Sequence, residues 1–341
     1  MTTDPHNCNK SRLTPFNAAL YDGDLRSLEI VIANLFAKDA VIQWTHPFEC
    51  ISGPNAIVSE IYQPLTQAIP DLERRDFFLV GGNADGCDWV GCGGYYTGFM
   101  TGDWLDIPAP RQQVHMRFHE FYRFDGGQIV ETQAVWDIPE LIKQAGVWPM
   151  APSLGLEWHV PGPASQDGLV PAPYDQQKSA ASLRLVGDML SALTKSPKGG
   201  AAMQLDKYWH PKMNWYGPSG IGTGRHISGF RHMHQIPFLK AMPDRGTDPN
   251  GKRYLFADGN YVAVTGWPNM RMTLSSDGWL GLAPADQKLT MRSLDFWRCE
   301  NGLIRENWVL IDMLHVYHQL GIDVFNRMRE MRRDARSDYC P

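Results

Sequence analysis

The chain has 341 residues, of which 43% are hydrophobic and 20% are charged, with a formal net charge of -5. This length predicts about two domains of ordinary size, each able to bury a core of its own. The slight acidic excess, without a stripe of lysine and arginine, argues against a nucleic acid partner. The sequence also contains no run of about 18 apolar residues that could span a membrane.

The N-terminal part predicts helices before strands. Residues 1–12 lack the apolar core of a secretory signal, so we expect a cytoplasmic protein. An amphipathic helical stretch over residues 12–38 leads into a short strand, AVIQW. A break at Gly53 and Pro54 precedes a second helical stretch over residues 55–69.

Four strands are expected next, with the sequences FFLVGG, DWVGCGGYYTG, VHMRFHEFYRF and IVETQAVW. The last two are joined through Asp125, Gly126 and Gly127, which tolerate the positive φ of a tight hairpin. The core of this unit is therefore predicted to be an antiparallel sheet.

A short helix is predicted after the last of these strands. Asp137 can cap it, Glu140 at the third helical position completes a capping box, and Gly146 ends it. Residues 149–174 are rich in proline and predict an extended linker. A helical stretch, QQKSAASLRLVGDMLSALTK, then opens the second half, and a polar helix is expected over residues 323–336.

The chain contains one segment twice. Residues 114–146 align without a gap onto 289–321, at a constant offset of 175. The identical pairs are Met116/Met291, Arg117/Arg292, Phe121/Phe296, Arg123/Arg298, Gly127/Gly302, Ile129/Ile304, Glu131/Glu306, Asp137/Asp312, Gln144/Gln319 and Gly146/Gly321. A two-unit repeat of this length indicates duplicated domains rather than a solenoid.

We therefore predict an α+β protein with two cone-shaped domains, each a curved antiparallel sheet with helices on one face that enclose a pocket. The first domain is placed at residues 10–148 and the second at 175–323. Between them lies the linker 149–174, and residues 324–341 form a C-terminal helical tail.

Two strings carry a resemblance to a known family. The first consists of TG…G…IPA followed by F.RF..G.IVE…VWD…L…G; its carriers are Thr97, Gly98, Gly102, Pro108, Phe121, Arg123, Phe124, Gly127, Ile129, Glu131, Trp136, Asp137 and Gly146. This string resembles the SnoaL-like polyketide cyclases, members of the nuclear transport factor 2-like superfamily. The second, from Trp215 to Asp244, resembles a segment of tandem SnoaL-like proteins often labelled ester cyclases.

The resemblance implies a cone fold in both copies and acid/base chemistry without a cofactor. In characterised cyclases of this type, an Asp and a His on the last two strands carry out an aldol closure. The positions seven residues before the hairpin glycine are Glu120 and Asp295, and those seven residues after it are Ala134 and Val309. A plain aldol cyclase therefore remains one of several alternatives, beside isomerases, lyases and proteins that only bind.

One strand face of the first copy carries two histidines. If the hairpin closes between Phe124 and Gln128, His119 faces Gln133 and His115 faces Asp137, all on one face. An imidazole oriented by a carboxylate is a usable general base near neutral pH. The alternative is that this face is the outer face of the sheet or a domain interface. The second copy has neither histidine; its counterparts are Thr290, Leu294, Trp308 and Asp312.

The opposite face is mostly apolar but holds one carboxylate in each copy, Glu120 and Asp295. Such a group is either paired or has the raised pKa that a proton-abstracting base needs. The second copy also has His226, His232 and His234 within nine residues. The spacing of the last two does not suit a metal pair, and we select His234 as the one that lines the cavity.

We predict a cofactor-free acid/base enzyme, of cyclase, isomerase or lyase type, acting on a small, largely apolar or aromatic carbonyl compound. A non-catalytic binding or scaffold protein of the same fold is the alternative. The predicted catalytic residues are His115, His119, Glu120, Asp137, His234, Asp295 and Asp312, with the first copy preferred. The predicted substrate-binding residues are Trp44, Tyr95, Tyr122, Gln133, Trp215 and Trp297.

No cofactor, metal site, nucleic acid or membrane partner is predicted. No nucleotide, serine-hydrolase or zinc-protease motif is present. The cysteines show no CxxC and no matched spacing between the copies, which predicts free thiols. We expect the two domains to pair within the chain, because an open sheet face would otherwise be exposed; whether the pair dimerises again is left open.

Overall fold

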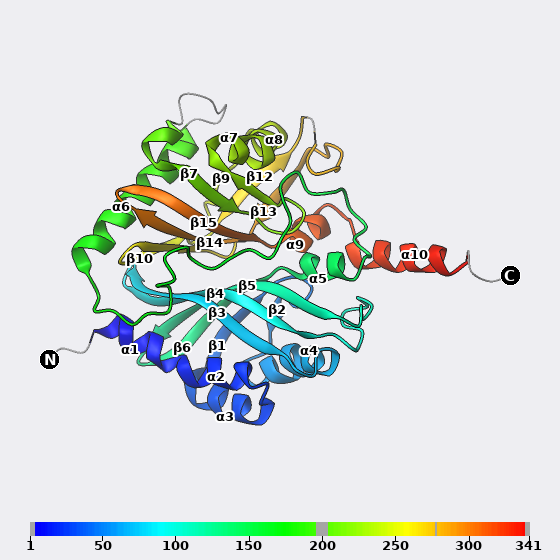
Figure 1. Ribbon diagram of the computed structural model, residues 1–341, viewed down its shortest axis with the longest axis horizontal. Coiled ribbons are helices and arrows are strands. Elements are labelled where there is room, and N and C mark those ends of the chain that lie inside the picture. The colour runs from blue at the N-terminus through cyan, green and yellow to red at the C-terminus, as the bar shows by residue number, and fades with distance from the viewer. Residues whose placement is uncertain (1–3, 196–203, 277, 338–341) are drawn as a thin grey trace.

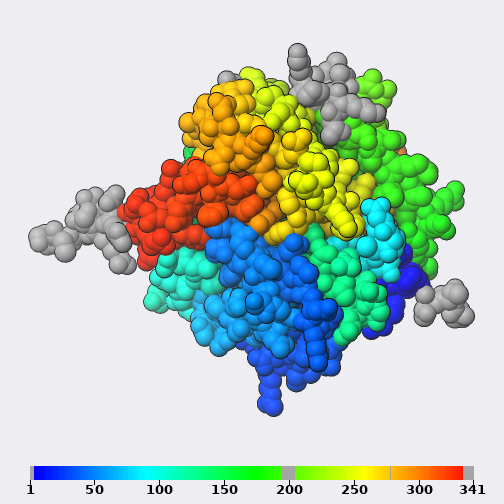
Figure 2. Space-filling view, turned by 180° about the vertical axis from the view of Figure 1, so that it is seen from behind, coloured from blue at the N-terminus to red at the C-terminus, as the bar shows by residue number. Residues whose placement is uncertain are grey.

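The two domains stack through their sheets in the computed structural model, which describes residues 4–195, 204–276 and 278–337. The helices of each domain lie on the outer side of its sheet (Figure 1). Seen from behind, the blue to cyan N-terminal residues fill the lower half, and the yellow to red C-terminal residues fill the upper half (Figure 2). No helix in the described ranges is both long and apolar enough to cross a membrane.

Domain 1 begins with helices α1 (Pro5–Arg12), α2 (Thr14–Tyr21) and α3 (Leu25–Leu35). Asp24 caps α3 by accepting a hydrogen bond from the Ser27 amide at 3.0 Å. The buried residues of α3 are Leu28, Ile32 and Leu35. They are three or four residues apart, so they lie on one side of the helix, which faces the sheet. A π-helical turn, η1 (Ile57–Tyr62), and α4 (Gln63–Ala68) complete the helical cover.

The sheet of domain 1 has the strand order β2-β1-β6-β5-β4-β3. Its strands are β1 (Phe36–Trp44), β2 (Cys50–Ile51), β3 (Glu73–Ala84), β4 (Cys87–Phe99), β5 (Gln113–Asp125) and β6 (Gln128–Trp136). β1 runs parallel to β6, whereas the other pairs are antiparallel. The sheet is therefore mixed, because the chain returns to β1 with β6 only after passing through four further strands, β2 to β5, and the helical turns η1 and α4.

The predicted register of the β5–β6 hairpin is wrong. Residues of β5 from Phe118 to Arg123 lie opposite residues of β6 that are two positions further along than predicted. The hairpin closes at Asp125 and Gln128, and a bulge lies between Arg123 and Phe124. His119 consequently lies opposite Val135, and Gln133 lies opposite Phe121. A bulge adds a residue to one strand only, so residues beyond it pair differently from a regular hairpin. The assignment of residues to the two faces is unaffected.

Domain 2 repeats the arrangement with the strand order β10-β11-β14-β15-β7-β8. These strands are β7 (Trp209–Tyr216), β8 (Thr223–Arg225), β10 (Tyr254–Asp258), β11 (Tyr261–Thr265), β14 (Ser293–Glu300) and β15 (Leu303–Ile311). A separate sheet, β13-β12-β9, contains β9 (Gly246–Thr247), β12 (Met270–Leu274) and β13 (Gln287–Met291). The long strands of domain 1 are thus each interrupted in domain 2.

The helices of domain 2 cover the outer face of its sheet. They are α6 (Gln176–Lys195), the 3-10 turn η3 (Leu205–Lys207), α7 (His226–Phe230), the π-helical turn η4 (Arg231–Gln235) and α8 (Ile236–Ala241). Short helices close each repeat: α5 (Ile138–Gln144) in domain 1 and α9 (Met313–Gln319) in domain 2. The last helix, α10 (Val324–Ser337), projects at the boundary between the domains (Figure 1).

A shared apolar core joins the two sheets. Its largest side chains are Phe78, Trp89, Tyr95 and Phe121 from domain 1 and Tyr216, Tyr254, Phe256, Tyr261, Phe296 and Trp308 from domain 2. The linker, residues 149–174, contains no helix or strand and adds Val160 to this core. The convex face of each sheet is therefore covered by the other domain, and the concave face is covered by helices.

Candidate functional site

A cavity of about 180 Å³ lies between the sheet of domain 2 and its helices. Its walls are mostly apolar and include Met189, Leu193, Trp209, Trp215, Phe230, Phe238, Met270, Trp297, Val309 and Ile311. The few polar side chains include His234, Arg245, Arg253, Ser293, Asp295 and Asn307. Ligand sites in proteins commonly combine apolar walls with a small number of placed polar groups.

Two substitutions between the repeats make room for this cavity. Phe118 of domain 1 corresponds to Ser293 in domain 2, and Trp136 corresponds to Ile311. Both aromatic side chains are buried in domain 1, at 0% and 1% exposure. Their smaller counterparts both line the cavity. The same cone is therefore filled in domain 1 and hollow in domain 2.

Asp295 is the carboxylate of this cavity. It lies on β14 between Val264 and Val309 of the neighbouring strands. Ser293 Oγ donates a hydrogen bond to its Oδ1 at 2.7 Å. Burial raises the pKa of Asp295 from 3.8 to about 7, against the lowering effect of the Ser293 hydrogen bond. The residue can therefore both take and release a proton near neutral pH.

His234 forms part of the aromatic wall of the same cavity. Its ring stacks on Trp215, with centroids 4.2 Å apart and planes 12° apart, and on Phe238 at 5.2 Å. Burial, and secondly the charge of Arg245, lower the pKa of His234 to about 3. The imidazole is consequently neutral at physiological pH.

The corresponding carboxylate of domain 1, Glu120, is fully paired. Its Oε2 accepts hydrogen bonds from Arg74 Nη1 and Tyr122 OH, both at 2.6 Å. Its Oε1 accepts from Trp136 Nε1 at 2.8 Å and Tyr96 OH at 3.1 Å. Four donors therefore satisfy both oxygens of this carboxylate, which is the structural alternative that the sequence left open.

Two of the predicted binding residues belong to this filled interior. Tyr122 is a partner of Glu120, and Trp44 packs edge-on against Trp136 with ring centroids 5.2 Å apart. Both side chains are buried to within 1% exposure. They therefore pack the core of domain 1.

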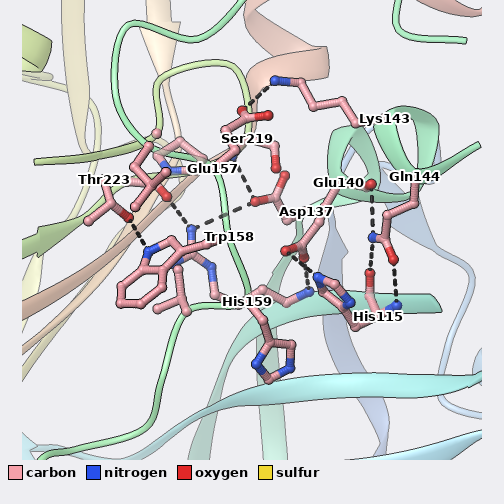
Figure 3. A pocket seen from close by; sticks show the side chains of 16 residues that line it. His115, Asp137, Glu140, Lys143, Gln144, Glu157, Trp158, His159, Ser219 and Thr223 are labelled. Carbon is pink, nitrogen blue, oxygen red and sulfur yellow. Dashed lines mark hydrogen bonds and ion pairs between the residues drawn. The ribbon is translucent and has the colours of Figure 1, made fainter. Parts of the chain in front are cut away.

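A second cavity, of about 280 Å³, lies between the domains (Figure 3). It is lined by the end of β5, helix α5, the linker and the loop after β7, and its side chains are largely charged or polar. The labelled residues in the figure are His115, Asp137, Glu140, Lys143, Gln144, Glu157, Trp158, His159, Ser219 and Thr223. Two residues predicted as catalytic, His115 and Asp137, therefore share an enclosure.

The predicted pairing of His115 with Asp137 is wrong. His115 Nε2 lies 3.3 Å from Glu140 Oε1, while Asp137 accepts a hydrogen bond from the Ser219 amide at 2.9 Å (Figure 3). Asp137 also makes no side-chain cap on α5, so the capping box is wrong too. Glu140 is held away from the helix end because its Oε2 accepts from the Arg117 amide at 2.8 Å.

Asp137 titrates close to neutral pH. Burial, and then the neighbouring charge of Glu140, raise the pKa of Asp137 to about 7, against the effect of Arg117. Lys143 is paired with Glu157 and Ser153. Most charged groups of this cavity are thus already engaged with each other or with backbone.

The remaining predicted residues lie at the domain interface. His119 Nδ1 donates to the Leu294 carbonyl of domain 2 at 2.6 Å, and burial keeps the pKa of this histidine well below 6.5. Gln133 Oε1 accepts from Thr265 Oγ1 at 2.5 Å. Asp312 pairs with Arg292 at 3.1 Å and accepts from the His46 amide. Tyr95 OH accepts from the Val160 amide at 2.9 Å.

The cone cavity of domain 2 therefore brings together four of the predicted residues, Trp215, His234, Asp295 and Trp297. Sequence reasoning missed Trp209, Arg245, Ser293 and Asn307. The repeat alignment contained a signal for Ser293, which stands where domain 1 has phenylalanine. Arg245 had no such signal, because it lies outside the gapless repeat.

Within the described ranges, no group of three or more His, Cys, Asp or Glu side chains is placed to hold a metal ion. Cys8, Cys50, Cys87, Cys92 and Cys299, the cysteines that the structure describes, are free.

Solved structures of other proteins are similar to part of the chain at low sequence identity. A protein from Jannaschia sp. CCS1 named as a SnoaL-like polyketide cyclase is 15% identical, with a TM-score of 0.37, over 42% of this chain and 96% of its own. IdmH from Streptomyces antibioticus, named as a polyketide cyclase, is 19% identical (TM-score 0.34) over 40% of this chain and 98% of its own. TsrD from Streptomyces laurentii is 17% identical (TM-score 0.34) over 41% and 95%.

No curated protein matches the chain. The family model described as SnoaL-like polyketide cyclase, in contrast, matches residues 16–145 and again residues 188–320. These two segments coincide with the two cones and together make up most of the sequence. The chain belongs to the SnoaL-like polyketide cyclase family, and it carries the family's domain twice.

Proposed function

We propose that the cone cavity of domain 2 binds a small, largely apolar or aromatic carbonyl compound and performs acid/base chemistry on it without a cofactor. The observation that carries the proposal is Asp295. Its carboxyl group has a pKa of about 7, accepts a hydrogen bond from Ser293, and lines a largely aromatic cavity. A base with a pKa near the working pH is the form that general catalysis favours.

The ionised Asp295 carboxylate takes a proton from the carbon next to the substrate carbonyl, and the electron pair of that C–H bond moves onto the carbonyl oxygen. Trp297 lies two residues along on the same strand face, and its buried Nε1–H has no partner among the described residues. This N–H can donate to the developing enolate oxygen. Where a C=C bond is conjugated with the enolate, return of the proton from Asp295 to the far carbon of that bond shifts the double bond and completes an isomerisation. Attack of the enolate carbon on a second carbonyl forms the new C–C bond of a cyclisation, and the alkoxide so formed takes the proton back from Asp295.

We favour domain 2 as the catalytic domain, whereas the sequence analysis preferred domain 1. Glu120 accepts four hydrogen bonds, one of them from Arg74, and Trp136 and Phe118 occupy the space around it. His119 is engaged with the other domain. In the proposed reaction Trp215 and His234 form a flat wall for the substrate ring rather than act on its protons.

The test measures how fast the hydrogen on the carbon next to the carbonyl group exchanges for deuterium. NMR monitors this exchange in D₂O for a panel of aromatic and polyketide-like ketones. Replacing Asp295→Asn is expected to slow enzyme-dependent exchange by roughly 10²–10⁴. Asp286→Asn, an exposed aspartate of the same domain, is the matched control and is expected to have no effect.

Two outcomes would move the assignment. Binding of panel compounds without any exchange would support the alternative, a non-catalytic binding protein. Loss of exchange in Asp137→Asn, with Asp295→Asn unaffected, would place the chemistry in the cavity between the domains, where Asp137 and His115 lie.

A further inference from the structure

Several buried polar groups around the cavity of domain 2 have no hydrogen-bond partner within the part of the chain that the structure describes. They are Trp209 Nε1, His234 Nδ1, Arg245 Nη1 and Trp297 Nε1, all on residues that line it. Indole and guanidinium nitrogens can only donate. A ligand that satisfies them must therefore bring acceptor oxygens.

Arg245 adds a positive charge to this set. Its Nη2 donates to the Leu193 carbonyl at 3.0 Å, at the end of α6. Among the described residues no carboxylate is paired with it: its neighbour Asp244 accepts hydrogen bonds from the amide and hydroxyl of Thr273 instead. A partly buried cation without a counter-charge is unfavourable in the empty protein, and an anion in the cavity would relieve it.

The positions of the charged groups indicate how such a ligand lies. The charge of Arg245 acts on His234, which stacks against Trp215 and Phe238. Arg245 follows α8 and contacts the end of α6, whereas Asp295 lies on β14 and accepts a hydrogen bond from Ser293 of the same strand. The guanidinium and the carboxyl group therefore reach the cavity from different elements, so one ligand can present a carboxylate to Arg245 and another part to Asp295.

We propose that the ligand of this cavity is an aromatic or apolar acid whose carboxylate binds Arg245, while its ring lies against His234 and Trp215. One further step rests on the proposed function: the substrate is then a keto acid whose carbonyl end faces Asp295. The carboxylate satisfies Arg245 Nη1 with a charge-assisted hydrogen bond. Domain 1 offers no such site, because its interior arginine, Arg74, is paired with Glu120 and Asp76.

The experiment compares 2-naphthoate with the neutral, similarly shaped 2-naphthamide by isothermal titration calorimetry on the full chain. The wild-type protein is expected to bind the carboxylate at least tenfold more tightly than the amide. Arg245→Met is expected to bring this ratio close to one, and Arg245→Lys to keep part of it. Lys240→Met, which removes an exposed charge from α8, is the matched control and is expected to keep the full ratio.

Thermal unfolding of each variant checks the fold, since Arg245 also holds the Leu193 carbonyl, and the lysine variant preserves a donor there. Equal binding of the two probes by the wild-type protein, no measurable binding of 2-naphthoate, or a preference that survives Arg245→Met would each overturn the proposal. Asp295→Asn should keep the preference. Failure of the catalytic proposal in the exchange assay would therefore leave this ratio intact, so the two proposals fail separately.

Discussion

Phe121 and Phe296 occupy equivalent positions in the two domains, and their rings stack on each other with centroids 5.0 Å apart and planes 20° apart. A pseudo-twofold axis therefore passes between them. Gly91 lies directly against both rings: a Cβ there would come within 2.8 Å of Phe296 and 2.9 Å of Phe121. His119 and Leu294, another equivalent pair, meet at the same interface. The duplicated domains thus form inside one chain the contact that two subunits would make.

Truncating this stack should weaken the whole molecule. Phe296→Ala removes a fully buried ring from the core shared by both sheets and is expected to cost about 3–5 kcal/mol of unfolding free energy. Urea denaturation measures the loss. Phe99→Ala, at a side chain that is 46% exposed, is the control and should change stability little. Equal stability of the two variants would contradict a shared core.

The filled cone of domain 1 predicts a large cost for removing its carboxylate. Glu120→Ala leaves the buried guanidinium of Arg74 with Asp76 alone and is expected to destabilise the protein by about 3–5 kcal/mol. Glu73→Ala breaks the exposed Glu73–Arg75 pair and should cost less than about 1 kcal/mol. Similar midpoints in urea for both variants would show that Glu120 is not held as described.

The raised pKa of Asp295 predicts that stability falls with rising pH. The unfolded carboxyl group ionises near 3.8 and the folded one near 7, so between these values the unfolded state releases a proton that the folded state keeps. The folded protein therefore loses stability as pH rises toward 7. Asp295→Asn should gain roughly 2–3 kcal/mol relative to wild type between pH 5 and pH 8.

Urea titrations of both proteins at the two pH values check this prediction, with Asp286→Asn as the exposed control. A difference between wild type and Asp295→Asn that does not change with pH would mean that the carboxyl group titrates normally. The rate of proton exchange should follow the opposite course, rising with pH through about 7 as the basic form of Asp295 appears.

Refilling the cone of domain 2 should close the site without touching its carboxylate. Ile311→Trp restores the residue that domain 1 has at the equivalent position, where Trp136 is buried. Binding of 2-naphthoate is expected to fall at least tenfold, and overpacking to cost about 1–3 kcal/mol. Ile311→Val is the control and should retain binding. Unchanged affinity in the tryptophan variant would place the ligand elsewhere.

The sequence by itself determined the duplication and the faces of the strands. Identical pairs recur because each member makes the same local contact: Gln144 bonds both backbone groups of His115, and Gln319 does the same at Thr290. Alternation along β5 and β14 placed Glu120 and Asp295 on one face of each sheet, opposite the face that carries the histidines of β5 and their counterparts. These features depend on neighbours close in sequence or on the period of a strand, which a sequence pattern contains.

Only the tertiary structure decided which cone is hollow and which face is an interface. Arg74 lies 46 residues before the Glu120 with which it pairs, whereas Asp295 accepts from Ser293 of its own strand and pairs with no arginine or lysine in the described part of the chain. From the sequence, His119 of β5 suited catalysis and packing equally, and the structure buries it against Leu294 of domain 2. The pKa of a carboxyl group depends on every charge and donor within a few ångströms, and those neighbours come from strands and helices that only folding brings together.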